Sequence, residues 1–393
     1  MYLTKEEERA YDGEQGWAYQ TCMKILVRLG ELYGASRLIP ASWAHVSGVS
    51  YKTLGDSPID FLKAMANTGA KVGTRATLNP QSLDPEYLKR KVTSELLEKQ
   101  LSIIEQFDKM GFTQSLTCTP YYLEKPKAGS HLAWAESSAV VYANSVLKSW
   151  TNREGGPSAL AAAITGKTPD YGVHHAENRQ PQVFVDIDLP LRNETEYGAL
   201  GVFLGRMLRD RIPAIKGLDN APEIGLKQLG AGLASTGMVN MFEWNDVTAE
   251  KTAHANERIT VERRDVDDTI EGLSTSADME ADLVFVGCPH CSVHEIECVA
   301  AMIENRKVKP GLEFWVCTSQ CAKQQAKKSV ERIEKSGGHV LTGVCTVVSW
   351  TEALGIRTIM TNSAKTAYYA PTLNKAKTIL APAEKCVQAA FRG

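Results

Sequence analysis

The 393-residue sequence has no apolar run near the roughly 18 residues that a membrane-spanning helix needs. Five of its first nine residues are charged, and this start lacks the apolar stretch of a secretion signal. The formal net charge of -2 excludes a bulk positive field for nucleic acid, so an anionic ligand would need a local binding site. Internal repeats and low-complexity tracts are also missing. We therefore expect a cytoplasmic globular protein that binds neither membrane nor nucleic acid.

The cysteines do not indicate a disulfide framework. The nine cysteines are an odd number in a long chain without a secretion signal, which favours reduced thiols. Cys22 and Cys386 fall in helical patterns and are expected to be packed small hydrophobes. Other cysteines are then candidates for metal binding or catalysis.

The N-terminal part mixes helical patterns with short strands. Thr4-Lys5-Glu6-Glu7 has capping-box spacing and predicts a helix from about Lys5. Apolar residues at helical spacing predict a helix over 84–110 that begins near Pro85 and stops at Gly111. Residues 38–40 are predicted to form a short strand, and the Gly/Ser-rich segment 42–55 a loop.

The rest of the chain predicts parallel sheets. Residues 182–187 and 213–215 are expected to be strands on either side of a helix over 194–208, and the polar stretch 245–268 to contain a connection. In the last third, five predicted strands alternate with helices: 282–286, 312–316, 339–342, 357–360 and 377–380. Such alternation is typical of βαβ units, whose ligands bind beyond the carboxyl ends of the strands.

These patterns predict an α/β protein of two or three domains. We place the regions at 1–180, with the His45 and Cys118 loops, at 181–265, a middle lobe and connection, and at 266–393, with Cys288 and Cys345.

Three cysteines lie in small-residue turns after apolar runs. Cys288 occurs in Gly287-Cys288-Pro289-His290-Cys291-Ser292, and Cys118 and Cys345 lie in similar turns. Three thiols at strand ends could hold an iron-sulfur cluster with one iron left free to act as a Lewis acid. Spacing alone, however, does not select these three from nine.

Other interpretations of the cysteines remain open. Cys288-Pro289-His290-Cys291 matches a redox dithiol, in which a helix N-terminus lowers a thiol pKa. Cys288, Cys291, Cys317 and Cys321 have spacing that resembles a zinc site. Each cysteine could also be a packed thiol.

Several polar loops are candidates for anion binding. Residues 151–160 predict a loop that enters a helix, where backbone N–H groups beside Arg153 could bind a carboxylate or phosphate, although an ordinary capped helix start is an equal alternative. Thr361-Asn362-Ser363-Ala364-Lys365 follows a predicted strand and could also bind an anion. The polar loop with His45 and Lys52 is expected to contact substrate. His174 and His175 are expected at the surface.

Taken together, these segments resemble the large subunit of the aconitase X family over essentially the whole chain. The resemblance rests on residues 45–52, 117–121, 151–160, 287–290 and 361–365, in that order. It implies an aconitase-like multi-domain α/β fold with parallel sheets that lacks the swivelling domain. It also implies an iron-sulfur cluster, most simply 4Fe-4S with one open iron, and a small swivelling-domain subunit as partner.

The family resemblance implies a hydro-lyase. Two activities are known in the family, dehydration of mevalonate 5-phosphate in a modified mevalonate pathway of isoprenoid biosynthesis and dehydration of cis-3-hydroxy-L-proline. We favour the first, because Lys52, Arg75, Arg153 and Lys365 could together meet a phosphate and a carboxylate.

Roles carried over from the family fall on named residues. The implied cluster ligands are Cys118, Cys288 and Cys345, with Cys291 as a possible substitute. The base is implied to be a serine of the swivelling part, while His45 or His290 could donate a proton to the departing hydroxyl. Ser363 is a further catalytic candidate. The substrate-binding candidates are Ser47, Gly48, Ser50, Lys52, Arg75, Asn152, Arg153, Gly155, Gly156, Ser158, Asn362 and Lys365.

Overall fold

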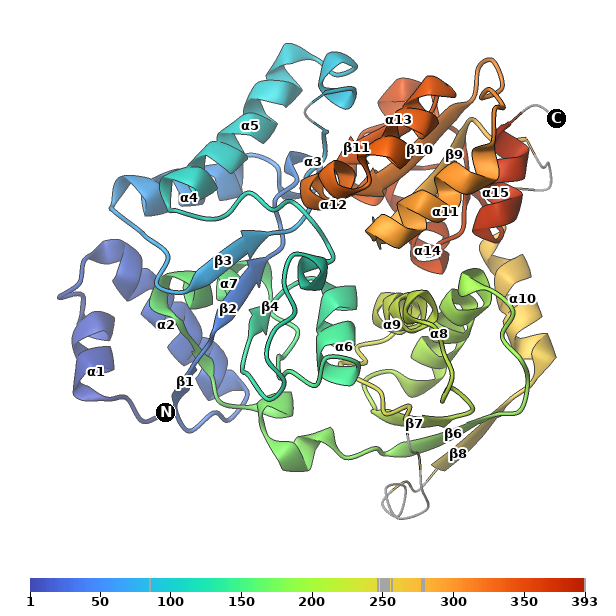
Figure 1. The fold of residues 1–393 in the computed structure, drawn as a ribbon. Coiled ribbons are helices and arrows are strands. Elements are labelled where there is room, and N and C mark those ends of the chain that lie inside the picture. The colour runs from blue at the N-terminus through green and yellow to red at the C-terminus, as the bar shows by residue number, and fades with distance from the viewer. Residues whose placement is uncertain (85, 246, 248–254, 256, 277–279, 392–393) are drawn as a thin grey trace.

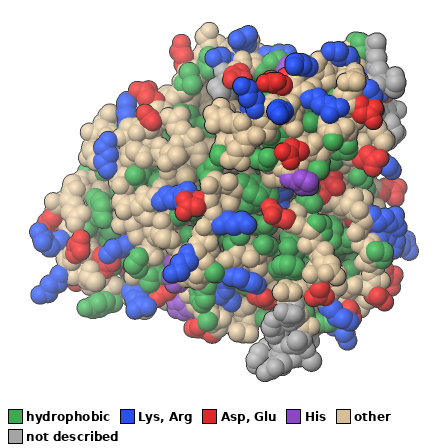
Figure 2. All heavy atoms as spheres, in the orientation of Figure 1, with side chains coloured by type: hydrophobic (Ala, Val, Ile, Leu, Met, Phe, Trp, Pro, Cys, Tyr) green, Lys and Arg blue, Asp and Glu red, His purple; other side chains and the backbone are tan. Residues whose placement is uncertain are grey.

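Three groups of helices and parallel strands meet around a common centre in the computed structural model (Figure 1). The structure describes residues 1–84, 86–245, 247, 255, 257–276 and 280–391. Among these residues, no helix has the length and apolar character to cross a membrane. On the face drawn in Figure 2, acidic and basic side chains are interspersed.

The first group surrounds a three-stranded parallel sheet of order β3-β2-β4. The Ala-rich helix α7 is buried between this sheet and α2, with its N-terminus at the carboxyl edge of the strands. A separate antiparallel pair joins β1 to β5. The elements are α1 Lys5–Asp12, α2 Trp17–Leu32, β1 Leu38–Pro40, β2 Trp43–Val46, α3 Tyr51–Leu54, α4 Ser57–Asn67, β3 Arg75–Leu78, α5 Ser94–Lys109, β4 Ala133–Trp134, α6 Ser137–Ser145, α7 Gly156–Thr165 and β5 Lys167–Pro169.

The second group has a three-stranded parallel sheet of order β7-β6-β8, covered by helices. Glycines allow α8 and α9 to approach closely, since a Cβ on Gly201 would meet the carbonyl oxygen of Leu229. The elements are β6 Val183–Ile187, α8 Glu194–Leu208, β7 Pro213–Lys216, α9 Glu223–Thr236, β8 Glu257–Val261 and α10 Arg263–Leu273.

The third group is a five-stranded parallel sheet of order β11-β10-β9-β12-β13, with helices on both faces. Strand order reverses at β9, so the crevice between the carboxyl ends of β9 and β12 is the expected ligand position of such a sheet. The elements are β9 Leu283–Cys291, α11 Val293–Ile303, β10 Glu313–Thr318, α12 Gln320–Gln325, α13 Lys327–Lys335, β11 His339–Thr342, β12 Thr358–Thr361, α14 Ala364–Leu373, β13 Lys377–Leu380 and α15 Ala383–Ala390.

The prediction of five parallel strands in the last third is confirmed, but β9 is longer than expected. It continues through Cys291 instead of stopping at 286, with a register shift against β10 between Val316 and Thr318. Gly287, at φ 117°, allows this irregularity, since a Cβ there would meet the carbonyl oxygen of Cys317. Cys288 therefore lies within an irregular strand end.

Three other expectations were wrong in part. The helix expected from residue 84 begins at Ser94, because the Asp84 carboxylate accepts hydrogen bonds from Tyr87 N and Leu88 N in a separate turn and Thr93 caps the helix. Pro85 lies outside the described residues. The expected loop 42–55 contains the buried strand β2 and the short α3. The polar stretch 245–268, where described, includes β8 and the start of α10.

Candidate active site

The loops that carry Cys118, Cys288 and Cys345 are joined by one residue, His290. Its backbone N–H donates to Cys118 Sγ at 3.2 Å. Its ring lies between the other two loops, with Nε2 2.9 Å from the carbonyl oxygen of Val344 and Nδ1 3.1 Å from Thr117 Oγ1. Since Nε2 must donate to a carbonyl, neutral His290 accepts at Nδ1 from the threonine hydroxyl. The structure therefore connects the three cysteine loops that the sequence separates.

Electrostatics also connect the three thiols. Burial raises the pKa of Cys118 well above its usual range, and repulsion from Cys288 adds to this. Burial raises the pKa of Cys345 to about 12, again with a contribution from Cys288. The Lys365 ammonium opposes both shifts. The cysteines and Lys365 are therefore near enough to act on one another.

A buried ion pair lies beside these cysteines. Lys365 Nζ is 2.5 Å from Glu136 Oε1, and the two side chains are 14% and 10% exposed. Asn79 Nδ2 at 2.8 Å and Ser138 Oγ at 2.9 Å donate to the same carboxylate. Burial would raise the pKa of Glu136, but attraction to Lys365 and these hydrogen bonds lower it to about 2. The carboxylate in turn holds the pKa of Lys365 above its usual range, against the effect of burial.

Glu136 was missed by sequence reasoning. The available signal was its position as N-cap of α6 at the end of β4, where a polar side chain meets the same sheet edge as the His45 loop.

His45 lies on β2 and is fully buried. Its Nδ1 is 2.8 Å from Thr77 Oγ1, which also accepts from Trp43 Nε1. Within the described part of the chain, Nε2 has no hydrogen-bond partner. Burial lowers the pKa of His45 to about 4, although the Glu136 carboxylate works in the opposite direction. Contacts with Asn79 and with the backbone of Thr117 also oppose the shift, and His45 is neutral at pH 7.

The glycine-rich loop at α7 meets the loop after β2. A Cβ on Gly156 would be 3.0 Å from the carbonyl oxygen of Ser47, so the two segments approach closely. Ser158 Oγ accepts from Gly155 N at 3.0 Å, as in a capped helix start. Asn152 braces the segment after β5 through Tyr171 O and Val173 N. Both interpretations of this loop, capped helix start and anion site, fit its backbone.

Lys52 and Arg75, two of the four expected basic residues, are held by partners other than Glu136. Lys52 Nζ donates to Ser349 O at 2.7 Å and pairs with Glu352 at 2.8 Å. Arg75 stacks 3.8 Å from the centre of the Trp43 ring and forms an ion pair with Glu124. Of the four expected cations, Lys365 is the one that the structure places beside the cysteines.

Arg153 lines a separate cavity of about 800 Å³, together with Asn152, and donates to Gly237 O at 3.4 Å. Ser50, with Gly48 nearby in sequence, turns toward Ser82 Oγ at 2.5 Å and Val348 O at 3.0 Å.

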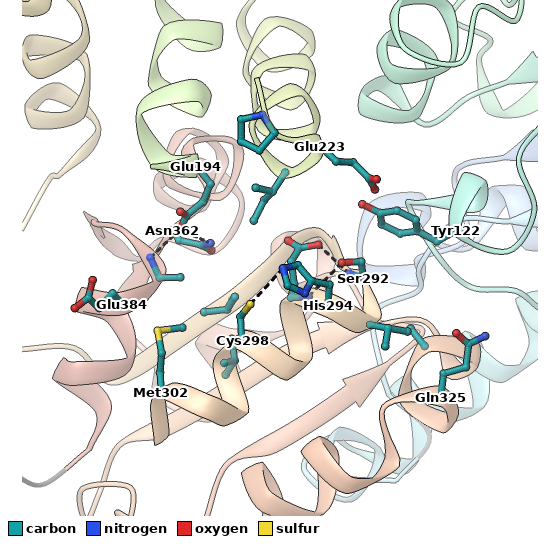
Figure 3. A pocket seen from close by; sticks show the side chains of 18 of the residues that line it. Tyr122, Glu194, Glu223, Ser292, His294, Cys298, Met302, Gln325, Asn362 and Glu384 are labelled. Atoms are coloured by element: carbon teal, nitrogen blue, oxygen red, sulfur yellow. Dashed lines mark hydrogen bonds between the residues drawn. The ribbon is translucent and has the colours of Figure 1, made fainter. Parts of the chain in front are cut away.

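Two residues of the segment after β12, Asn362 and Ser363, make hydrogen bonds within the fold. Ser363 is fully buried and caps α14 by accepting from Thr366 N. Asn362 Nδ2 donates to Glu194 at 3.1 Å. Asn362 lines a second cavity, of about 650 Å³, along α11, into which Ser292, His294 and Cys298 also face (Figure 3).

The two adjacent histidines differ in burial. His175 is half-buried and pairs with Asp170 at 2.9 Å. The expectation of surface placement was wrong for His174, which is buried with Nδ1 2.9 Å from His131 Nδ1. Burial lowers the pKa of His174 to about 3, with a further contribution from His131.

The zinc interpretation needs Cys288, Cys291, Cys317 and Cys321 to converge on one ion. Within the described ranges, no three His, Cys, Asp or Glu side chains are arranged around one ion, and Cys321 lines the cavity along α11. The redox interpretation requires Cys288 at a helix N-terminus, whereas Cys288 lies within β9 and the next helix, α11, begins only at Val293. A cluster has several irons, so its thiolates need not converge on one point.

Comparisons with known proteins cover nearly the whole chain. Family models match the first domain of aconitase X at residues 1–177, the second at 181–271 and the third at 281–392. The crystal structure of Thermococcus kodakaraensis aconitase X in its holo-form superimposes with a TM-score of 0.92 at 39% identity, covering 99% of this chain and 100% of that chain.

Two kinds of curated relatives are similar. A phosphomevalonate dehydratase large subunit from Methanocaldococcus jannaschii is 42% identical over 99% of this chain and 100% of its own length. A cis-3-hydroxy-L-proline dehydratase from Pseudomonas aeruginosa is 32% identical over 97% of this chain but 68% of its own length. Both relatives are named as dehydratases.

Proposed function

The chain belongs to the aconitase X family, and from this premise we propose that it is the large subunit of a hydro-lyase acting on mevalonate 5-phosphate. The product is trans-anhydromevalonate 5-phosphate. The observation that supports this substrate is the match along the full length of phosphomevalonate dehydratase large subunits, with higher identity than to the longer hydroxyproline enzymes. The relative from Methanocaldococcus jannaschii is named as a large subunit, which supports a small swivelling-domain subunit as the partner of this chain.

We propose Cys118, Cys288 and Cys345 as the ligands of an iron-sulfur cluster of the 4Fe-4S type. When bound, such a cluster with one open iron supplies a Lewis acid for the substrate hydroxyl. The reaction breaks a C–H bond next to the carboxylate and the C–O bond of the hydroxyl, forms a C=C bond and releases water. The proton acceptor is proposed to come from the partner, as the family implies.

Lys365 is proposed to bind an oxygen of the substrate carboxylate. Its charge is maintained by Glu136, and its burial strengthens any interaction with an anion, since the local dielectric is low. As negative charge builds up next to the carboxylate during proton removal, a fixed cation there stabilises the transition state more than the ground state.

His45 is proposed to donate a proton to the departing hydroxyl. A neutral imidazole with its Nδ1 accepting from Thr77 carries its proton on Nε2, where it can be donated. The loop Ser47–Ser50 and the start of α7 with Gly155 are proposed to bind the phosphate through backbone N–H groups.

An anaerobic assay of the chain with a purified small partner tests this function. We expect iron-dependent dehydration of mevalonate 5-phosphate and much weaker turnover of cis-3-hydroxy-L-proline. The reverse preference would transfer the assignment to the hydroxyproline reaction. A colourless, iron-free protein after anaerobic reconstitution would refute the cluster altogether.

A further inference from the structure

Two adjacent residues of the second domain contact the turn that carries Cys288. We propose that Lys227 and Gln228 of α9 are positioning residues that fix this turn in the geometry that cluster binding requires. The proposal rests on the proposed function, because it concerns the same three cysteines. It deepens that function by assigning the second domain a part in assembling the site.

The contacts lie at both ends of the turn. Gln228 Nε2 donates to the carbonyl oxygen of Cys288 at 3.1 Å, and Lys227 Nζ donates to that of His290 at 3.2 Å. Lys227 and Gln228 are both buried, with at most 2% of each residue exposed. Two successive side chains therefore bind two carbonyls of an irregular strand end, where regular pairing with β10 is interrupted.

A buried lysine at this point is costly and needs a partner. Lys227 is held by Glu295 at 2.5 Å, with the Tyr122 ring 5.4 Å away. Glu295 also accepts from Ser292 N at 2.9 Å and so caps α11. A buried ion pair contributes little net stability compared with apolar packing. Its use here is better explained by specific geometry than by stability.

The position of the turn determines the rest of the site. His290 contacts Cys118 Sγ directly and the Val344 carbonyl next to Cys345, so a shift of the turn moves both neighbouring loops. Close packing at Gly198, whose Cβ would be 3.1 Å from Ala364 Cβ, ties α8 to the start of α14. Residues that orient metal ligands through such contacts typically change metal affinity about 10- to 100-fold when replaced.

The main test replaces Gln228 by Leu, which removes the donor and keeps a side chain of similar size. Its matched control is Gln388→Leu on α15, where the amide donates to exposed Glu384 at 3.2 Å. We expect reconstituted Gln228→Leu to lose iron to a chelator about 10- to 100-fold faster than wild type, with Gln388→Leu unchanged. In the iron-free protein, we expect faster alkylation of Cys288 in Gln228→Leu.

The outcomes separate the two proposals. Wild type that binds no iron refutes the cluster, while the alkylation rate still tests the contact to Cys288. Wild type that binds iron, with Gln228→Leu equal to it in iron retention and in alkylation, refutes the positioning role.

A second variant addresses Lys227, whose removal alone would leave Glu295 buried without its cation. Lys227→Met combined with Glu295→Gln removes both charges. We expect this folded double variant to show altered cluster EPR and faster iron loss. If the folded protein retains wild-type EPR and iron retention, Lys227 has no positioning role.

Discussion

Replacing Lys365 by Met tests whether the buried cation beside the cysteines is held by Glu136 as the structure indicates. The substitution removes the ammonium and leaves the carboxylate in a site where it is 10% exposed. Asn79 and Ser138 still donate to it, so the charge keeps part of its solvation.

The cost can be estimated in two ways. Removing one partner of a buried ion pair costs about 3–5 kcal/mol. The lowering of the Glu136 pKa from 4.5 to about 2, to which Lys365, Asn79 and Ser138 contribute against burial, corresponds to about 3–4 kcal/mol at about 1.4 kcal/mol per pKa unit. Because the remaining donors are retained, we expect a loss of about 3 kcal/mol in the free energy of unfolding at pH 7. The contribution is present above the unfolded pKa of Glu136 and is lost as pH falls toward the folded value.

Urea unfolding followed by tryptophan fluorescence measures the effect. Lys109→Met is the matched control, since its pair with Glu105 is exposed and worth less than about 1 kcal/mol. Adding Glu136→Gln to Lys365→Met should restore about 1–2 kcal/mol, because no buried charge is then left unpaired. A double variant no more stable than Lys365→Met would refute the reasoning. In the reconstituted enzyme, we expect kcat of Lys365→Met to fall about 100- to 1,000-fold.

Three further predictions concern other parts of the chain. Cys345→Ser should prevent stable iron binding, whereas Cys386→Ser, in α15, should leave iron content and activity unchanged; equal iron content in both would contradict the ligand assignment. The folded pKa of His174 lies below its unfolded value, so below pH 6.5 the unfolded chain binds more protons than the folded chain. The free energy of unfolding should therefore decrease as the pH is lowered. The loss should be about 2 kcal/mol between pH 6.5 and 5, measured by urea unfolding, and a His174→Gln variant with the same slope would contradict it. Gly156→Ala should press against the loop after β2 and raise KM more than it lowers kcat, which steady-state kinetics would show; an unchanged KM would argue against substrate binding there.

The sequence predicted the last third best because local patterns decide its structure. Strands such as His339–Thr342 and Lys377–Leu380 are short apolar runs between helices, and both matched the structure. Errors arose where local signals compete. The helical spacing before Ser94 was overridden by the Asp84 side chain, which bonds the backbone into a turn.

The site was harder to predict because its contacts join distant segments. Glu136 and Lys365 are separated by 229 positions and Gln228 and Cys288 by 60, so no spacing within a motif connects them. Lys52 shows the same difficulty. It lies in a segment whose polar residues suggested substrate binding, and its ion-pair partner, Glu352, is 300 positions away.

The proposed site draws on three domains, which explains why each motif is weak when taken alone. Cys118 comes from the first domain, Cys288 and Cys345 from the third, and the side chains of α9 that contact the Cys288 turn from the second. Each proposed ligand comes from a different loop, and His290 holds these loops together through its contacts with Val344 and Thr117. For this reason no single segment carries several ligands. Replacing His290 by Gln should therefore separate positioning from proton transfer. Because both ring nitrogens of His290 have partners, we expect iron retention and activity to fall together. Loss of activity in protein that keeps its full iron content would refute a role in positioning alone.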